Sequence, residues 1–192
     1  MAIHDLRLDP TPTSMLLAPV EPTSAPFFSF ALLTFASALA SFVFACATPF
    51  AAFAVVAAAM LPFSSALLMI LGVWIVNQCI GFGALHYPHD TNTIFWGLVI
   101  GAAALAATFI ATAVLRIVSQ TSAAIAFGLA LLAAYVVYEL VLFGATSFLG
   151  GEGAFTAPIV ARIGALNIVW LIGIVAASEI VRSLNRRYRT AS

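Results

Sequence analysis

Charged residues are scarce in this sequence. They make up 7% of the 192 residues, hydrophobic residues make up 64%, and lysine is absent. Soluble domains carry about a quarter charged residues, so water cannot be the main solvent of this chain. Seven arginines balance seven acids, and the resulting net charge of zero gives no indication of a nucleic-acid or acidic partner.

Cysteines and catalytic motifs are equally sparse. Cys46 and Cys79 both lie in apolar stretches, where a thiol packs as a small hydrophobe, so we expect neither a disulfide nor a metal thiolate. The chain has no Walker loop, no dinucleotide glycine fingerprint, no HExxH motif and no nucleophile accompanied by a base. The sequence therefore predicts neither an enzyme nor a bound cofactor.

Long apolar runs are what the sequence has in abundance, and its mean hydropathy is +1.14. Several runs approach the roughly 20 residues that a helix needs to cross a hydrocarbon core about 30 Å thick. They are apolar on nearly every side, whereas the strands of a membrane barrel alternate apolar and polar residues. The predicted fold is all-α, a polytopic membrane helical bundle of six transmembrane helices. Their expected ranges are 27–46, 50–61, 65–82, 94–114, 122–143 and 159–180.

The second of these ranges is the shortest. Pro49 and Pro62 bound it, because proline stops a helix, and its length is short for a full crossing. It is either tilted, shielded by neighbours, or re-entrant, and a re-entrant segment would leave five crossings. The expected organisation is a disordered polar tail over 1–26, a transmembrane domain over 27–182 and a basic cytoplasmic tail over 183–192.

The arginines predict the orientation of the bundle. With six spans, Arg7, Arg116 and the four arginines beyond residue 181 share one side of the membrane, and only Arg162 lies near the other. Cytoplasmic loops carry an excess of basic residues. Both termini are therefore expected in the cytoplasm, with the chain in a bacterial inner membrane; the five-span alternative would place the N-terminal tail outside.

Polar side chains within the spans are candidates for function, because each costs free energy unless it is satisfied. Asn77 and Gln78 lie near the outer end of the third range, where they serve either interhelical hydrogen bonds or ligand contacts. Adjacent helix positions point about 100° apart, so the two carboxamides are not expected to face the same partner. Asn167, three residues before Trp170, is a further candidate with interhelical packing as its default role.

Glu139 is the only acid deep within a span, and Tyr135 shares its helix face one turn earlier. Its carboxyl group is expected to find a partner in Arg162, the loop imidazoles or a cationic ligand, and both structural and functional roles stay open. Counting residues from the outer ends of their spans puts Glu139 and Asn77 at similar depth. If the two helices are neighbours, this predicts one polar cavity toward the outer face.

The loop after the third range gathers His86, His89 and Asp90. These groups either contact an incoming solute or are simply solvated. A proline separates the two histidines and no third histidine lies nearby, so a metal site is not expected.

Small residues form a last pattern. Ala36 and Ala40 make a small-xxx-small pair on the first range, and residues 101–107 are small except for Leu105. Such faces let helix backbones approach closely, either within the bundle or against another subunit.

Six spans in a chain of this size, an alanine-rich first helix, a proline break and a short second helix resemble the substrate-binding S components of energy-coupling-factor transporters. The resemblance covers the general plan from about residue 30 to 180. It implies uptake of a vitamin or metal ion that binds near the outer face, and docking of the alanine pair on a membrane coupling subunit that works with ATPases. The implied pocket residues are Asn77, Gln78, His86, His89 and Glu139. His4 departs from the metal-binding members, whose histidine stands almost at the N-terminus.

A structural or assembly subunit of a larger membrane complex is the alternative function, from a different class. Under it, the polar residues merely pack and the small-residue faces meet other subunits. Ligand binding by the isolated chain distinguishes the two.

Overall fold

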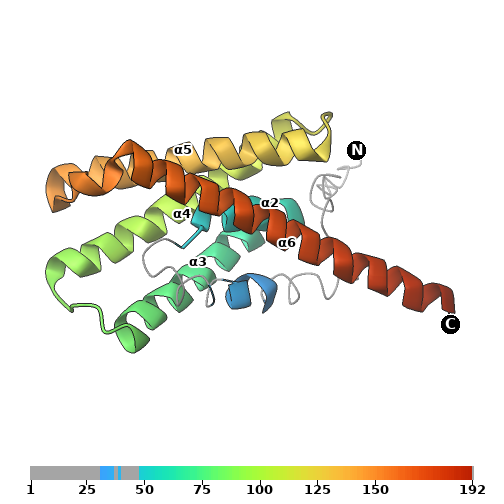
Figure 1. The fold of residues 1–192 in the computed structure, drawn as a ribbon, viewed down its shortest axis with the longest axis horizontal. Helices are drawn as coiled ribbons and strands as arrows, with labels where there is room; N and C mark the ends of the chain where they lie inside the picture. Colours follow the sequence, from blue (N-terminus) through green and yellow to red (C-terminus); the bar gives the residue numbers. More distant parts are fainter. Residues whose placement is uncertain (1–30, 37–38, 40–47, 192) are drawn as a thin grey trace, which may run out of the picture.

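The computed structural model of the chain describes residues 31–36, 39 and 48–191. Within these ranges the protein is an all-α bundle of apolar helices (Figure 1). Four helical segments are long and apolar enough to cross a membrane, and they span Phe63–Ala84, Thr91–Ile117, Ala123–Leu149 and Ala157–Val181. The prediction of a helical membrane bundle is therefore confirmed. The predicted tail over 1–26 and most of the first expected span lie outside the described residues.

The helices extend beyond the expected ranges. Helix α4 (Thr91–Ile117) begins three residues earlier than expected, and α5 (Ala123–Leu149) runs six residues further. The gap between the fifth and sixth expected ranges, residues 144–158, therefore begins too early. Helix α5 stops only at Gly150, whose φ of +74° is a left-handed conformation that suits glycine. Helix α6 (Ala157–Ala191) continues through the segment expected to be a tail.

Helix α2 (Phe50–Met60) is enclosed by the rest of the bundle. All of its residues are buried, and it packs against α3 (Phe63–Cys79), α4, α5 and α6. Its 11 residues make it about 17 Å long, little more than half of the hydrocarbon thickness. The packing shows that neighbouring helices shield this short segment.

Two glycines bring α3 and α4 together. A side chain at Gly101 would lie within 3 Å of the Trp74 ring, and one at Gly97 would lie within 3 Å of the Gln78 carboxamide. The Trp74 indole N–H also donates to the Gly97 carbonyl oxygen at 2.8 Å. Gly97 and Gly101 thus form a GxxxG face that receives two side chains one turn apart on α3. The small residues of α4 serve packing within the bundle.

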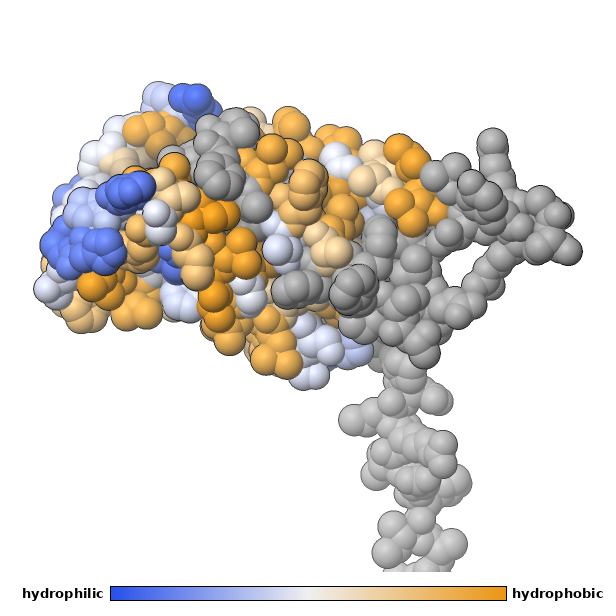
Figure 2. Space-filling view, turned by 90° about the horizontal axis from the view of Figure 1, so that it is seen from below, coloured by the Kyte–Doolittle hydropathy of each residue, from blue (hydrophilic) through white to orange (hydrophobic). Residues whose placement is uncertain are grey.

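The surface separates into an apolar flank and a polar end. Figure 2 shows hydrophilic residues gathered at the end of the molecule that carries the loops before α4 and α6, with hydrophobic residues over the flank. Helix α6 is the least buried of the four long segments. An apolar flank bounded by a polar end is the surface that a lipid bilayer requires.

Candidate functional site

The N-terminus of α2 lies inside the bundle, and its backbone donors need partners there. The first four N–H groups of a helix have no partner within the helix, and Pro49 at the cap position supplies no side-chain hydrogen bond. The Ala52 N–H instead donates to Oδ1 of Asn167 on α6 at 3.0 Å, and Asn167 is 2% exposed. Its Nδ2 donates to the Ile163 carbonyl oxygen at 3.0 Å. Asn167 is therefore a cap supplied from another helix.

Two carboxamides of α3 reach the same end of α2. Nδ2 of Asn77 donates to the buried Thr48 hydroxyl at 2.9 Å, and Nε2 of Gln78 donates to Oδ1 of Asn77 at 3.2 Å. The expectation that adjacent carboxamides face different partners is incomplete, because their flexible side chains bring them into contact with each other. We call Thr48, Asn77, Gln78 and Asn167 the α2 cap cluster.

Aromatic rings complete the surroundings of this helix end. The Phe50 ring lies 6.2 Å from the Tyr138 ring of α5, and the Phe53 ring meets Trp170 of α6 edge-on at 6.0 Å. Asn167 and Trp170 therefore both contact α2, as the interhelical packing expected of them requires. The α2 N-terminus is joined in this way to α3, α5 and α6.

Contacts with the start of α2 indicate how deep Asn77 and Glu139 lie in the bundle. Asn77 contacts Thr48, just before α2, and Tyr138, the neighbour of Glu139, contacts Phe50 at the first position of α2. Both polar groups therefore lie near one level of the bundle. Sequence had offered no reason to place α2 at that level. A shared cavity between them stays a prediction.

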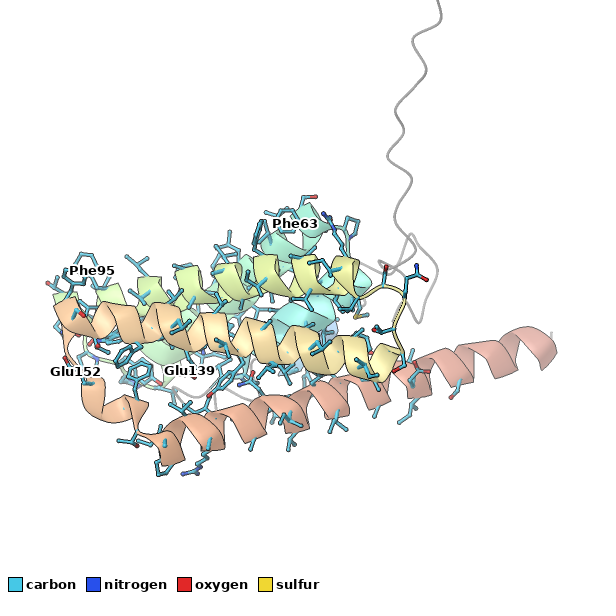
Figure 3. The ribbon with its side chains drawn as sticks, turned by 90° about the horizontal axis from the view of Figure 1, so that it is seen from above. Phe63, Phe95, Glu139 and Glu152 are labelled. Carbon is cyan, nitrogen blue, oxygen red and sulfur yellow. The ribbon has the colours of Figure 1, made fainter. Side chains whose placement is uncertain are left out.

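Glu139 is half-buried on the side of α5 that α6 crosses (Figure 3). Its carboxyl group lies near the Tyr135 hydroxyl, one turn earlier, and the expected pairing with Arg162 is not formed among the described residues. The Tyr135 hydroxyl donates to the Val160 carbonyl oxygen of α6 at 2.6 Å. Tyr135 has one hydroxyl proton, and Val160 accepts it, so Tyr135 does not also donate to Glu139, whose carboxyl oxygens keep their acceptor capacity.

The loop between α3 and α4 folds back on the end of α3. A π-helical turn, η2 (Ile80–Ala84), follows α3, and the Tyr87 ring lies against Gly81, where a side chain would come within 3 Å of it. The His86 imidazole lies 3.0 Å from the Ala84 carbonyl oxygen, and the His89 ring packs on Phe82 with centroids 5.3 Å apart. Both histidines are exposed, and each has an intramolecular contact.

Asp90 has a specific local role. Its carboxylate accepts hydrogen bonds from the backbone N–H and the hydroxyl of Thr93, at 2.9 and 3.0 Å, which makes it the N-cap of α4. These hydrogen bonds from Thr93 hold the pKa of Asp90 below its usual value. The sequence Asp-Thr-Asn-Thr before an apolar run is a helix-start signal, and it accounts for Asp90 as a capping residue.

Helix α6 crosses α5 obliquely (Figures 1 and 3), and a groove lies between the two helices. Its volume is about 880 Å³, and its lining is apolar except for Tyr135 and Asn167. The lining runs from Ala124 to Tyr135 along α5 and from Val160 to Ala176 along α6. The groove therefore follows the apolar stretch of two candidate membrane spans.

The remaining candidates are placed as follows. Ala36 is buried within the chain, and Ala40 lies outside the described residues. No group of three or more His, Cys, Asp or Glu side chains that could hold a metal ion occurs in the described part of the chain.

Sequence reasoning missed the contacts of Thr48, Trp74 and Gly97. Of these three residues, only Gly97 had a signal in the sequence, its GxxxG spacing with Gly101.

Comparison of the chain with protein-family models, curated proteins and solved structures finds no match. Its class therefore rests on the helices themselves. The protein is an integral membrane protein of the all-α, polytopic class, and a lipid bilayer is its environment.

Proposed function

We propose that the protein is a membrane-embedded binding and uptake component for a small molecule, with its site at the α2 N-terminus and Glu139. The observation that carries this proposal is the buried half-helix α2, whose N-terminus lies within the bundle among polar side chains of other helices. Transporters build substrate sites where the ends of short helix segments lie inside the bundle.

Glu139 gives the site its charge and its ligand preference. An ionisable residue within a membrane span is costly and is retained where it contacts an ion, a substrate or a partner. Tyr135 donates its only hydroxyl proton to Val160, so the Glu139 carboxyl group keeps acceptor capacity for an incoming amine or other hydrogen-bond donor. The exposed imidazoles of His86 and His89 lie on the outer side, where a solute would enter.

The energy source in this proposal is external to the chain. The resemblance to S components implies a membrane coupling subunit and ATPases as partners. Ala36 is buried, so a coupling subunit would contact it only after the first helix rearranged. The proposal places the chain in a bacterial inner membrane with both termini cytoplasmic.

Binding by the purified chain tests this function. The protein is screened by thermal denaturation against vitamins, amines and divalent metal ions, and any small molecule that copurifies is identified by mass spectrometry. A ligand at 100 times its Kd stabilises the folded state by about 2.7 kcal/mol, which is readily seen. No shift with any compound and no copurified small molecule would overturn the proposal.

A structural subunit of a larger complex is the second candidate, and one observation favours it. The described polar candidates all have intramolecular contacts, as Asn77, Asn167 and Asp90 illustrate. Under this alternative, the chain copurifies with other membrane subunits and the isolated chain binds no solute. Ligand binding by the isolated chain would exclude it.

A further inference from the structure

We propose that the hydrogen bond from Tyr135 to Val160 is a latch between α5 and α6, and that the charge of Glu139 opens and closes it. A neutral Glu139 leaves the Tyr135 hydroxyl on the Val160 carbonyl oxygen, and an ionised Glu139 draws the hydroxyl to itself. This inference concerns the conformation of the bundle, so it does not depend on the proposed uptake function.

Tyr135 joins α5 directly to the backbone of α6. Its hydroxyl donates to the Val160 carbonyl oxygen at 2.6 Å. Its ring lies against Gly164, where an added Cβ atom would be 3.1 Å from a ring carbon. Because both the hydroxyl and the ring contact α6, a hydroxyl that leaves Val160 changes the contact between the two helices.

The Tyr135 hydroxyl has one proton and two acceptors within reach. Glu139 lies one turn further along α5 on the same face, and its carboxyl group is near the hydroxyl. Val160 lies inside the helical ladder of α6, so its carbonyl oxygen keeps a backbone partner when the hydroxyl leaves. The hydroxyl itself needs a new acceptor in these apolar surroundings, and Glu139 supplies one.

Charge decides between the two acceptors. A hydrogen bond to an ionised carboxylate is roughly twice as strong as one between neutral groups. The gain corresponds to about fivefold or more in the ratio of the two arrangements. The structure holds the Val160 arrangement, in which the latch is closed.

The latch lies at one end of the groove between α5 and α6. The groove lining on α5 ends at Tyr135, and the lining on α6 begins at Val160, so the hydrogen bond joins the two walls there. Asn167 is the only other polar side chain of the lining, and its hydrogen bonds go to Ala52 and Ile163. Opening of the latch therefore frees this end of α6 to move away from α5.

Few other titratable groups surround Glu139 among the side chains that the structure describes. Helix α2 has none, and α4 has one near its far end, about 24 Å from the level of Glu139 at 1.5 Å per residue. Helix α6 has two described charged groups, of which the nearer does not pair with Glu139. The titratable and charged residues of α5 and of the elements packed against it are Tyr135, Tyr138, Arg116, Glu152, Arg162 and Glu179.

The test measures the distance between α5 and α6 by pulsed electron paramagnetic resonance at different pH. Spin labels are placed at Leu129→Cys on α5 and Val169→Cys on α6, because both positions are exposed and neither lines the groove. Alanine replaces Cys46 and Cys79 in this background. Between about pH 5 and about pH 9, we expect the mean distance to increase by about 1–2 Å, the size of a helix shift.

Variants assign this change to the two side chains. Glu139→Gln removes the charge and is expected to keep the shorter distance at both pH values, and Glu139→Ala repeats the test should Glu139→Gln not fold. Tyr135→Phe lacks the hydroxyl and is expected to show the longer distance at both. The matched control is Glu152→Gln, an exposed position that should respond to pH as the parent does.

Three results would overturn the inference. The first is a parent distance that does not change with pH. The second is a pH-dependent change that persists in Glu139→Gln or Glu139→Ala, because another titratable group would then control the helices. The third is a change that persists in Tyr135→Phe, because the hydroxyl would then not be the link.

Discussion

Replacing Asn167 by alanine removes the cap that α6 supplies to α2. The Ala52 N–H then lies buried without its acceptor, at a position where the wild-type hydrogen bond is 3.0 Å long and Asn167 is 2% exposed. A buried donor left unsatisfied costs about 1–3 kcal/mol, and loss of a helix cap costs about 0.5–2 kcal/mol. We expect Asn167→Ala to lower the free energy of unfolding by about 2 kcal/mol.

The assay is unfolding in mixed micelles of increasing SDS content, followed by circular dichroism. Asn92→Ala is the matched control, because Nδ2 of Asn92 also donates to a backbone carbonyl, that of Leu149 at 3.0 Å, but at an exposed position. Water replaces that bond, so the control is expected to cost less than about 1 kcal/mol. Equal losses in the two variants, within about 0.5 kcal/mol, would refute the capping role.

Three further predictions concern packing, pH and topology. Gly101→Leu forces a side chain into the Trp74 ring and should cost about 1–3 kcal/mol in the same SDS assay, whereas Gly144→Leu, in open space, should be near neutral. The lowered pKa of Asp90 means that its ionised carboxylate stabilises the fold above its ordinary pKa of 3.8, and that this stabilisation is lost as the pH falls through the lower folded pKa. Asp90→Asn should abolish that acid-induced loss in a pH titration of stability; an unchanged titration would contradict the assignment. Reporter fusions should alternate outside, inside, outside, inside at residues 88, 118, 150 and 190, and a C-terminus outside the cytoplasm would reverse the orientation.

Hydrophobicity made the helical class predictable from sequence. The apolar runs and the breaks at Pro49 and Pro62 located the described helices, with errors confined to their ends. The ends differ because continuation of a helix depends on local signals, such as the Asp90 cap and the left-handed Gly150, that hydropathy does not register. Hydrophobic composition determines whether a segment lies in the membrane, and capping residues determine where its helix ends.

The contacts of the site were less predictable because they are long-range. The hydrogen bond from Ala52 to Asn167 joins positions 115 residues apart, and nothing in either local sequence specifies the other. The Tyr135 and Glu139 contact was predictable, since four residues on a helix is a local spacing. Which side chains pair across helices depends on which helices are neighbours. Here the enclosed position of α2 makes it a neighbour of α3, α4, α5 and α6.

The central claim, that the chain binds and takes up a small molecule through a site that includes Glu139, is tested most directly by uptake in cells that carry Glu139→Gln. The exposed Glu152→Gln serves as the matched control, because it makes the same change outside the proposed site. A hydrogen bond to a charged group contributes about 1.5–3 kcal/mol, so Glu139→Gln should reduce uptake of the ligand found in the binding screen at least tenfold. The amount of folded protein should stay at the wild-type level, and Glu152→Gln should transport normally. Unchanged uptake in Glu139→Gln, with the folded protein present, would contradict the claim.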